Sequence, residues 1–205
     1  MSSELRLALA QANFCVGDIA GNRDIIIDLA LRARDAGADV VVMPELAITG
    51  YPPEDLLFRP GLHARVKAAL DLIAARVTGI HLVLGYPEPD GERLYNSCMV
   101  LHDGQVLANY RKQHLPNYAV FDEERYFAPG DCAVVVEIKG VRMGLSICED
   151  IWTPATAAQA RAAGAEFICN INASPYHLRK APERLAAVRA AVAAGGIPVA
   201  YVKIG

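Results

Sequence analysis

Three residues that could do chemistry follow three separate predicted strands: a carboxylate at Glu45, an ammonium at Lys112 and a thiol at Cys148. Burial at a strand end raises the pKa of a carboxylate and suits it to proton transfer near neutral pH. A fixed ammonium can stabilise an oxyanion, and a thiol can attack a carbonyl carbon. These residue types predict a thiol nucleophile with a proton shuttle and an oxyanion partner.

The segment around Cys148 is the most specific of the three. An apolar strand, Gly144–Ile147, delivers the cysteine to its carboxyl end, and two acids, Glu149 and Asp150, follow directly. A nucleophile at such a strand-to-helix bend lies near main-chain N–H groups that are free to bind an anion. Because neighbouring acids raise the pKa of a thiol, a cation such as Lys112 would be needed to favour the thiolate.

Each of these residues also has a purely structural explanation. Glu45 could cap the next segment or pair with a cation, and a lysine at a strand end is usually solvated. The other four cysteines have no CxxC spacing and are expected to be small buried hydrophobes, not disulfide partners: Cys15, Cys98, Cys132 and Cys169. The histidines show no paired ligand spacing, so no metal site is expected.

Composition predicts one soluble, cytoplasmic domain over residues 1–205. The chain is 53% hydrophobic and 21% charged, which is enough to bury an apolar core. No stretch of about 18 uncharged residues could span a membrane, and no export signal is expected. The net charge of -3 leaves no electrostatic footprint for nucleic acid.

The predicted elements alternate between two periods. Helices are predicted at 24–35, 62–77, 153–163 and 182–194. Strands are predicted at 5–10, 40–43, 81–85, 95–102, 105–111, 133–138, 141–147, 167–171 and 198–204. Asp103-Gly104 is typical of a tight hairpin turn, and the long aperiodic segment 112–130 is expected to be functional. This order favours an α/β fold with helices outside layers of sheet.

Glutamate, lysine and cysteine in this order resemble the catalytic residues of the nitrilase or carbon–nitrogen hydrolase superfamily, and the resemblance covers nearly the whole chain. Four motifs narrow it: GYPPEDLL at 50–57, VFDEERYF at 120–127, CEDIW at 148–152, and NASPYH at 172–177 with Lys180 after it. They are similar to segments of the N-terminal glutaminase domain of glutamine-dependent NAD synthetases. The superfamily fold is an αββα sandwich of two mixed β-sheets with helices outside.

The resemblance implies a Glu45, Lys112 and Cys148 triad that hydrolyses the side-chain amide of glutamine. Cys148 would form a thioester, and Lys112 with the backbone N–H after the cysteine would hold the oxyanion. Glu45 would take the thiol proton, protonate the leaving ammonia and activate water. Glu123 matches a further acid that positions the triad, with its neighbour Glu124 as the alternative.

The same resemblance places five residues around bound glutamine: Tyr118, Phe121, Glu149, Ser174 and Arg179. A hydroxyl and a backbone carbonyl could read the α-amino group, and Arg179 could hold the carboxylate as a fork. Aromatic packing for Tyr118 and Phe121, and a solvated surface charge for Arg179, are the alternatives.

In the resembled family, ammonia passes to a synthetase domain that uses ATP and Mg²⁺ to convert deamido-NAD to NAD. No Ser-Gly-Gly phosphate-binding motif occurs here, so this chain is expected to lack that domain, to need no cofactor itself and to be incomplete at its C-terminus. Association into homo-oligomers is also expected by analogy. The alternatives are a stand-alone amidase acting on a small carboxamide, and an inactive structural or interaction fragment.

Overall fold

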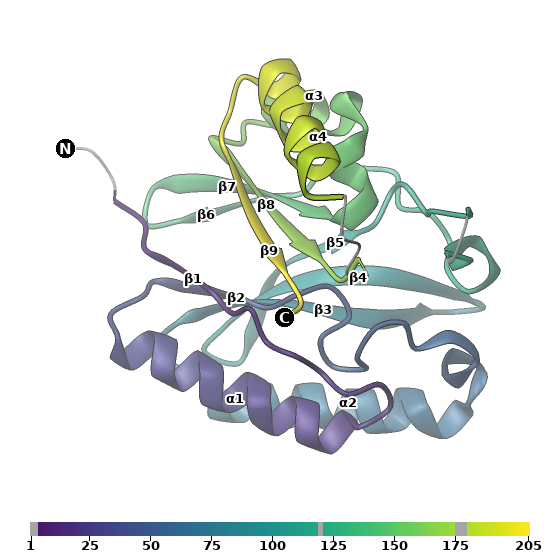
Figure 1. Ribbon diagram of the computed structural model, residues 1–205. Coiled ribbons are helices and arrows are strands. Elements are labelled where there is room, and N and C mark those ends of the chain that lie inside the picture. The colour runs from purple at the N-terminus through teal and green to yellow at the C-terminus, as the bar shows by residue number, and fades with distance from the viewer. Residues whose placement is uncertain (1–3, 119–120, 175–179) are drawn as a thin grey trace.

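Two β-sheets are stacked face to face, with a pair of helices on each outer side (Figure 1). The computed structural model describes residues 4–118, 121–174 and 180–205. In Figure 1, α1 and α2 cover the lower sheet, and α3 and α4 cover the upper one. Both sheets contain parallel and antiparallel pairs. The predicted αββα sandwich of two mixed sheets is confirmed.

The first sheet has the order β1-β2-β3-β4-β5. Its strands are β1 (Leu7–Leu9), β2 (Val40–Val42), β3 (His81–Asp90), β4 (Arg93–His102) and β5 (Gln105–Arg111). The first three run parallel, and β3, β4 and β5 form an antiparallel meander. The predicted hairpin turn is confirmed, because Asp103 and Gly104 both adopt positive φ angles of 45° and 79°.

The second sheet has the order β6-β7-β8-β9. Its strands are β6 (Val135–Ile138), β7 (Val141–Ile147), β8 (Phe167–Asn172) and β9 (Val199–Lys203). The β6–β7 pair is a hairpin, and the remaining pairs are parallel. Parallel neighbours bring the carboxyl ends of β7 and β8 to one edge of the sheet, where Cys148 and Ala173 follow.

The helices are α1 (Ile19–Asp35), α2 (Pro60–Arg76), α3 (Pro154–Ala162) and α4 (Lys180–Gly195). Helix α1 begins five residues earlier than predicted because the Asp18 side chain accepts a hydrogen bond from the Gly21 N–H and caps it. The described residues also form three short 3₁₀ helices, η1 (Glu54–Phe58), η2 (Glu123–Arg125) and η3 (Cys148–Trp152). Among the described helices, none is long and apolar enough to cross a membrane.

Alternate residues of the strands face different apolar layers. Val40 and Val42 pack between the sheets against residues such as Leu145 and Ile171, whereas Val41 packs toward α1 and α2. A third layer lies between the second sheet and helices α3 and α4. Burial on both faces explains the continuous apolar runs of these central strands, and it fixes the strand ends from which the polar residues project.

Candidate active site

A buried ammonium lies between two buried carboxylates. The Lys112 Nζ atom is 2.8 Å from Glu45 Oε1 and 2.8 Å from Glu123 Oε2. Glu45 follows β2, Lys112 follows β5, and Glu123 opens η2. The Lys112 side chain is fully buried, so the solvated lysine considered from the sequence is wrong for this residue. The cost of burying such a charge demands partners of this kind.

Both oxygens of Glu45 are held in place. The Asn96 Nδ2 group donates to Oε1 at 2.8 Å, where Lys112 also donates. The backbone N–H of Ala173, at the end of β8, donates to Oε2 at 2.9 Å. Groups from both sheets therefore fix this carboxylate, and among the described residues Oε2 accepts only from the Ala173 N–H.

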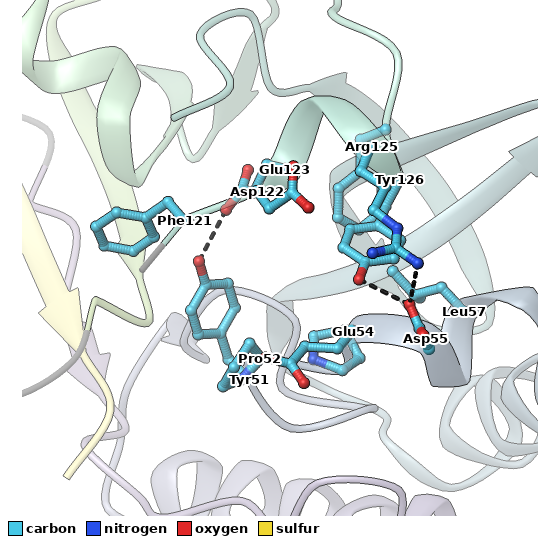
Figure 2. A pocket seen from close by; sticks show the side chains of 12 residues that line it. Tyr51, Pro52, Glu54, Asp55, Leu57, Phe121, Asp122, Glu123, Arg125 and Tyr126 are labelled. Atoms are coloured by element: carbon cyan, nitrogen blue, oxygen red, sulfur yellow. Dashed lines mark hydrogen bonds and ion pairs between the residues drawn. The ribbon is translucent and has the colours of Figure 1, made fainter. Parts of the chain in front are cut away.

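The structure separates the two neighbouring acids at the start of η2. Glu123 is 5% exposed and accepts hydrogen bonds from Lys112 and from the Tyr51 hydroxyl, the latter at 3.0 Å. Glu124 is exposed and accepts from the Asn117 side chain. The acid that contacts the lysine is therefore Glu123, and Figure 2 shows Tyr51 pointing toward it.

Cys148 is the first residue of η3, directly after β7, and only 6% of it is exposed. Its φ angle of 43° lies in the left-handed region, which costs a residue with a Cβ about 1–2 kcal/mol. Such strain concentrates at functional sites, where surrounding structure holds it. The sharp turn carries the thiol out of the strand direction, as the strand-to-helix bend predicted, although the helix is a 3₁₀ turn.

Burial and the surrounding charges set the protonation states of the site. Burial raises the pKa of the Cys148 thiol well above its usual range, and Glu45 adds to this rise while Lys112 opposes it. Burial alone would lower the pKa of Lys112, but Glu45 and Glu123 outweigh it and raise the pKa. Burial also raises the pKa of Glu123 to about 6. These shifts favour a neutral thiol and a charged lysine at rest.

Three of the residues expected around a substrate are in contact near the start of η3. The Tyr118 hydroxyl donates to the Glu149 carboxylate at 3.0 Å, and its ring meets Phe121 edge-on with centroids 5.6 Å apart. Ser174 is half-buried just after β8. Arg179 lies outside the described residues. The structure thus brings Tyr118, Phe121 and Glu149 together beside Cys148.

Two cavities flank this group. One, of about 280 Å³, is lined by Phe121, Glu123 and Tyr51 together with the acidic side of η1 (Figure 2). In it Asp55 pairs with Arg125 at 3.0 Å and accepts from the Tyr126 hydroxyl. The other, of about 700 Å³, is lined by Tyr118 and Glu149. Glu123 in the first lining contacts Lys112, and Glu149 in the second lining directly follows Cys148 in the chain.

Sequence reasoning missed several groups that shape the site: Asn96, Tyr51, the Ala173 N–H and Asp150. Asn96 lies inside a predicted strand, where an asparagine in a largely apolar segment was the available signal. Asp150 was considered only as an acid beside the thiol. It is fully buried and accepts four hydrogen bonds.

The remaining four cysteines differ in burial. Cys98 and Cys169 are buried as expected, whereas Cys15 and Cys132 are exposed, so the expectation of burial is wrong for those two. All five are free thiols. Within the described ranges, no group of three or more histidine, cysteine, aspartate or glutamate side chains could hold a metal ion.

A cysteine at a strained turn beside a buried carboxylate–ammonium pair defines a thiol hydrolase site on an αββα sandwich. The chain belongs to the carbon-nitrogen hydrolase family, which matches residues 6–203. A glutamine-dependent NAD(+) synthetase from Xylella fastidiosa is 47% identical over 207 residues, covering 100% of this chain and 38% of the relative. The chain therefore spans well under half the length of this curated relative.

Solved structures with similar folds include two kinds of enzyme. A glutamine-dependent NAD+ synthetase from Acinetobacter baumannii superposes with a TM-score of 0.93 at 36% identity, covering 98% of this chain and 38% of that one. An amidase from Nesterenkonia sp. superposes with a TM-score of 0.86 at 29% identity, covering 98% and 76%. A glutamate-to-glutamine mutant of that amidase shows acrylamide added at its active-site cysteine.

Proposed function

We propose that this chain hydrolyses the side-chain amide of glutamine through a thioester on Cys148. The observation that carries the proposal is the buried Lys112 ammonium bound to Glu45 and Glu123, within electrostatic reach of the Cys148 thiol. A neutral thiol needs a base at the moment of attack, and a buried carboxylate supplies one.

In the first half-reaction, Glu45 accepts the thiol proton as the sulfur bonds to the carboxamide carbon. We assign the accepting atom as Oε2, because Oε1 already accepts from Asn96 and Lys112. The carbonyl oxygen becomes an oxyanion held by Lys112 and the backbone N–H of Glu149. Glu45 then returns the proton to the nitrogen, the carbon–nitrogen bond breaks, and ammonia leaves.

In the second half-reaction, water replaces ammonia. Glu45 removes a proton from water as its oxygen bonds to the thioester carbon, and a second oxyanion forms in the same place. The carbon–sulfur bond then breaks, the sulfur regains the proton from Glu45, and glutamate leaves. Glu123 holds Lys112 without contacting substrate, while Tyr118, Phe121, Glu149, Ser174 and Arg179 form the glutamine subsite.

For the biological role, we propose that the ammonia serves a synthetase domain that uses ATP and Mg²⁺ to amidate deamido-NAD to NAD. The relatives named glutamine-dependent NAD(+) synthetase support this, since the match covers nearly all of this chain and only part of theirs. The proposal includes homo-oligomers acting in the cytoplasm, and this part of the protein needs no cofactor of its own.

Replacing Cys148 by alanine tests the chemistry. In the complete native protein, C148A should release no glutamate from glutamine and should make no NAD with glutamine as nitrogen donor. With ammonia as the donor, the same variant should still make NAD. Glutamate release by C148A at the wild-type rate would refute the nucleophile.

A stand-alone amidase is the second candidate, favoured by the superposition that covers 76% of the Nesterenkonia amidase. That alternative is supported if the wild-type protein hydrolyses a small carboxamide faster than glutamine and makes no NAD from deamido-NAD. An inert fragment is a third outcome. A folded protein in which a glutamine-like electrophile forms no adduct with Cys148, measured by intact mass, would support it.

A further inference from the structure

We propose that Asp150 is a positioning residue that fixes the turn bearing Cys148 against the strand end bearing Lys112. This inference rests on the proposed function, because it assigns Asp150 a part in the same hydrolysis. Asp150 is two residues after the nucleophile and fully buried. It lies in η3, which follows β7 of the second sheet. Three of the four groups that it binds belong to β5 of the first sheet or to the segment that follows it.

One carboxylate oxygen holds the loop that leaves Lys112. The Asp150 Oδ1 atom accepts from the backbone N–H of His114 at 2.8 Å and of Gln113 at 3.1 Å. Both donors follow Lys112 directly, so the backbone after the lysine is fixed by two bonds. Because both donors are backbone N–H groups, these bonds to the charged carboxylate do not depend on the rotamer of a donor side chain.

The other carboxylate oxygen holds both sheets at once. Asp150 Oδ2 accepts from the Tyr110 hydroxyl at 2.8 Å and from the Ile147 backbone N–H at 3.1 Å. Tyr110 lies in β5, two residues before Lys112, whereas Ile147 is the last residue of β7, one residue before Cys148. One atom therefore connects the strand of the lysine to the strand of the nucleophile.

The reaction needs such a connection because its parts come from different sheets. Lys112 belongs to the first sheet and Cys148 to the second, and the layer between the sheets is apolar. Apolar contacts are not directional, and a misplacement of about 1 Å can cost about 100-fold in rate. Four hydrogen bonds to one carboxylate are directional, so they fix the position of the Cys148 turn relative to the Lys112 segment. They also oppose relaxation of the strained Cys148 backbone.

Asparagine is the informative substitution. In Asp150→Asn the amide oxygen can replace Oδ1 and keep the His114 and Gln113 bonds. The amide nitrogen then faces the Ile147 N–H, and two donors meet. Tyr110 can turn its hydroxyl to accept, so the main loss falls on the nucleophile turn. Asp150→Ala removes all four bonds and should be more severe.

The matched control is Glu88→Gln. Glu88 is a half-buried carboxylate that accepts from Ser97, Asn109 and Arg111, all of them in the first sheet. It joins strands but does not join the two sheets, and it lies outside the catalytic group. Its substitution should lower the melting temperature and leave kcat for glutamine hydrolysis near wild type.

The experiment measures kcat and KM for glutamine hydrolysis, melting temperature and the rate of Cys148 alkylation by iodoacetamide, in the complete native protein. We expect D150N to lower kcat by about 100-fold with KM little changed, and D150A to lower it further. Folded D150N and D150A with wild-type kcat and alkylation rate would overturn the inference. If D150N does not fold, Tyr110→Phe tests the same link, and a wild-type kcat in Y110F would overturn it.

Failure of the proposed function is a separate result. If the wild-type protein hydrolyses no glutamine, the alkylation rates still decide about Asp150. A changed rate in D150N beside an unchanged rate in E88Q supports the positioning role, and equal rates in D150N and wild type overturn it.

Discussion

The Lys112 ammonium forms ion pairs with two carboxylates. It donates to Glu45 and Glu123 at 2.8 Å each, with no exposure to solvent. A buried group of two anions and one cation carries a net negative charge, so the thiol beside it stays neutral. Lys112 does lower the pKa of the Cys148 thiol, in the expected direction, but burial first and Glu45 second raise it by more.

Removing the lysine charge should destabilise the fold. In Lys112→Met, two buried carboxylates face each other without a counter-ion, and breaking such a buried pair costs about 3–5 kcal/mol. Urea unfolding at pH 7 measures the loss. The double variant K112M/E123Q should recover part of it, since one of the like charges is gone. Equal stability of K112M and wild type would contradict this account.

Glu123 should make stability depend on pH. Folding raises its pKa from 4.5 to about 6, chiefly by burial, so the folded protein holds the proton more tightly than the unfolded chain. Its contribution to the unfolding free energy therefore falls as pH rises from 4.5 through about 6, by about 2 kcal/mol. Urea titrations across this range check it, and Glu123→Gln should remove that part of the slope.

At the level of elements, the turn after β2 depends on a glycine in β3. A Cβ on Gly85 would lie 2.5 Å from the Leu46 nitrogen and 2.9 Å from the Glu45 Cα. The absence of a side chain therefore lets the segment carrying Glu45 pack directly on its neighbouring strand.

Gly85→Ala should push Glu45 away from Lys112. We expect a loss of about 1–3 kcal/mol from overpacking, together with a fall in kcat for glutamine hydrolysis. The control is Gly61→Ala in α2, where a Cβ meets nothing within 4 Å. That change should be neutral or stabilising by up to about 1 kcal/mol. A G85A protein with wild-type stability and activity would refute the close-packing argument.

Most elements could be predicted from the sequence because their signals are local. Both hairpin turns that were predicted contain a glycine after a residue with positive φ, Asp103-Gly104 and Lys139-Gly140. Strand β3 was predicted to end at Gly85, but it continues to Asp90 because β4 pairs with it along its whole length. Pairing of that kind depends on the partner strand, which local pattern does not reveal.

The sequence predicted several residues of the site but did not predict the contacts between them. Strand ends indicated Glu45, Lys112 and Cys148, and motifs indicated Glu123. That Asn96 and the Ala173 N–H bind Glu45 depends on contacts 51 and 128 residues apart in sequence. No local periodicity encodes such distances, because they arise only when the two sheets pack.

At the level of the whole molecule, the layer between the sheets has a different task from the outer layers. It sets how far Cys148 lies from Lys112, whereas the layer under α1 and α2 supports one sheet only. Equal losses of stability in the two layers should therefore have unequal effects on catalysis.

Ile171→Ala and Ile73→Ala test this difference. Both side chains are fully buried, one in β8 between the sheets and one in α2. Each change should cost about 2–5 kcal/mol, measured by urea unfolding. In the folded protein, I171A should lower kcat for glutamine hydrolysis while I73A should leave it near wild type. Equal kcat values in the two variants would show that the inter-sheet layer has no special role.

The neutral state of Cys148 also bears on how the protein withstands oxidants. Peroxides react with thiolates and only slowly with thiols, and this sulfur is buried in a site that disfavours ionisation. In the proposed mechanism, the thiol therefore rests in its least oxidisable form and would lose its proton to Glu45 only as a substrate carbon arrives. The thiols of Cys15 and Cys132 are exposed, so oxidants reach them more readily than they reach Cys148.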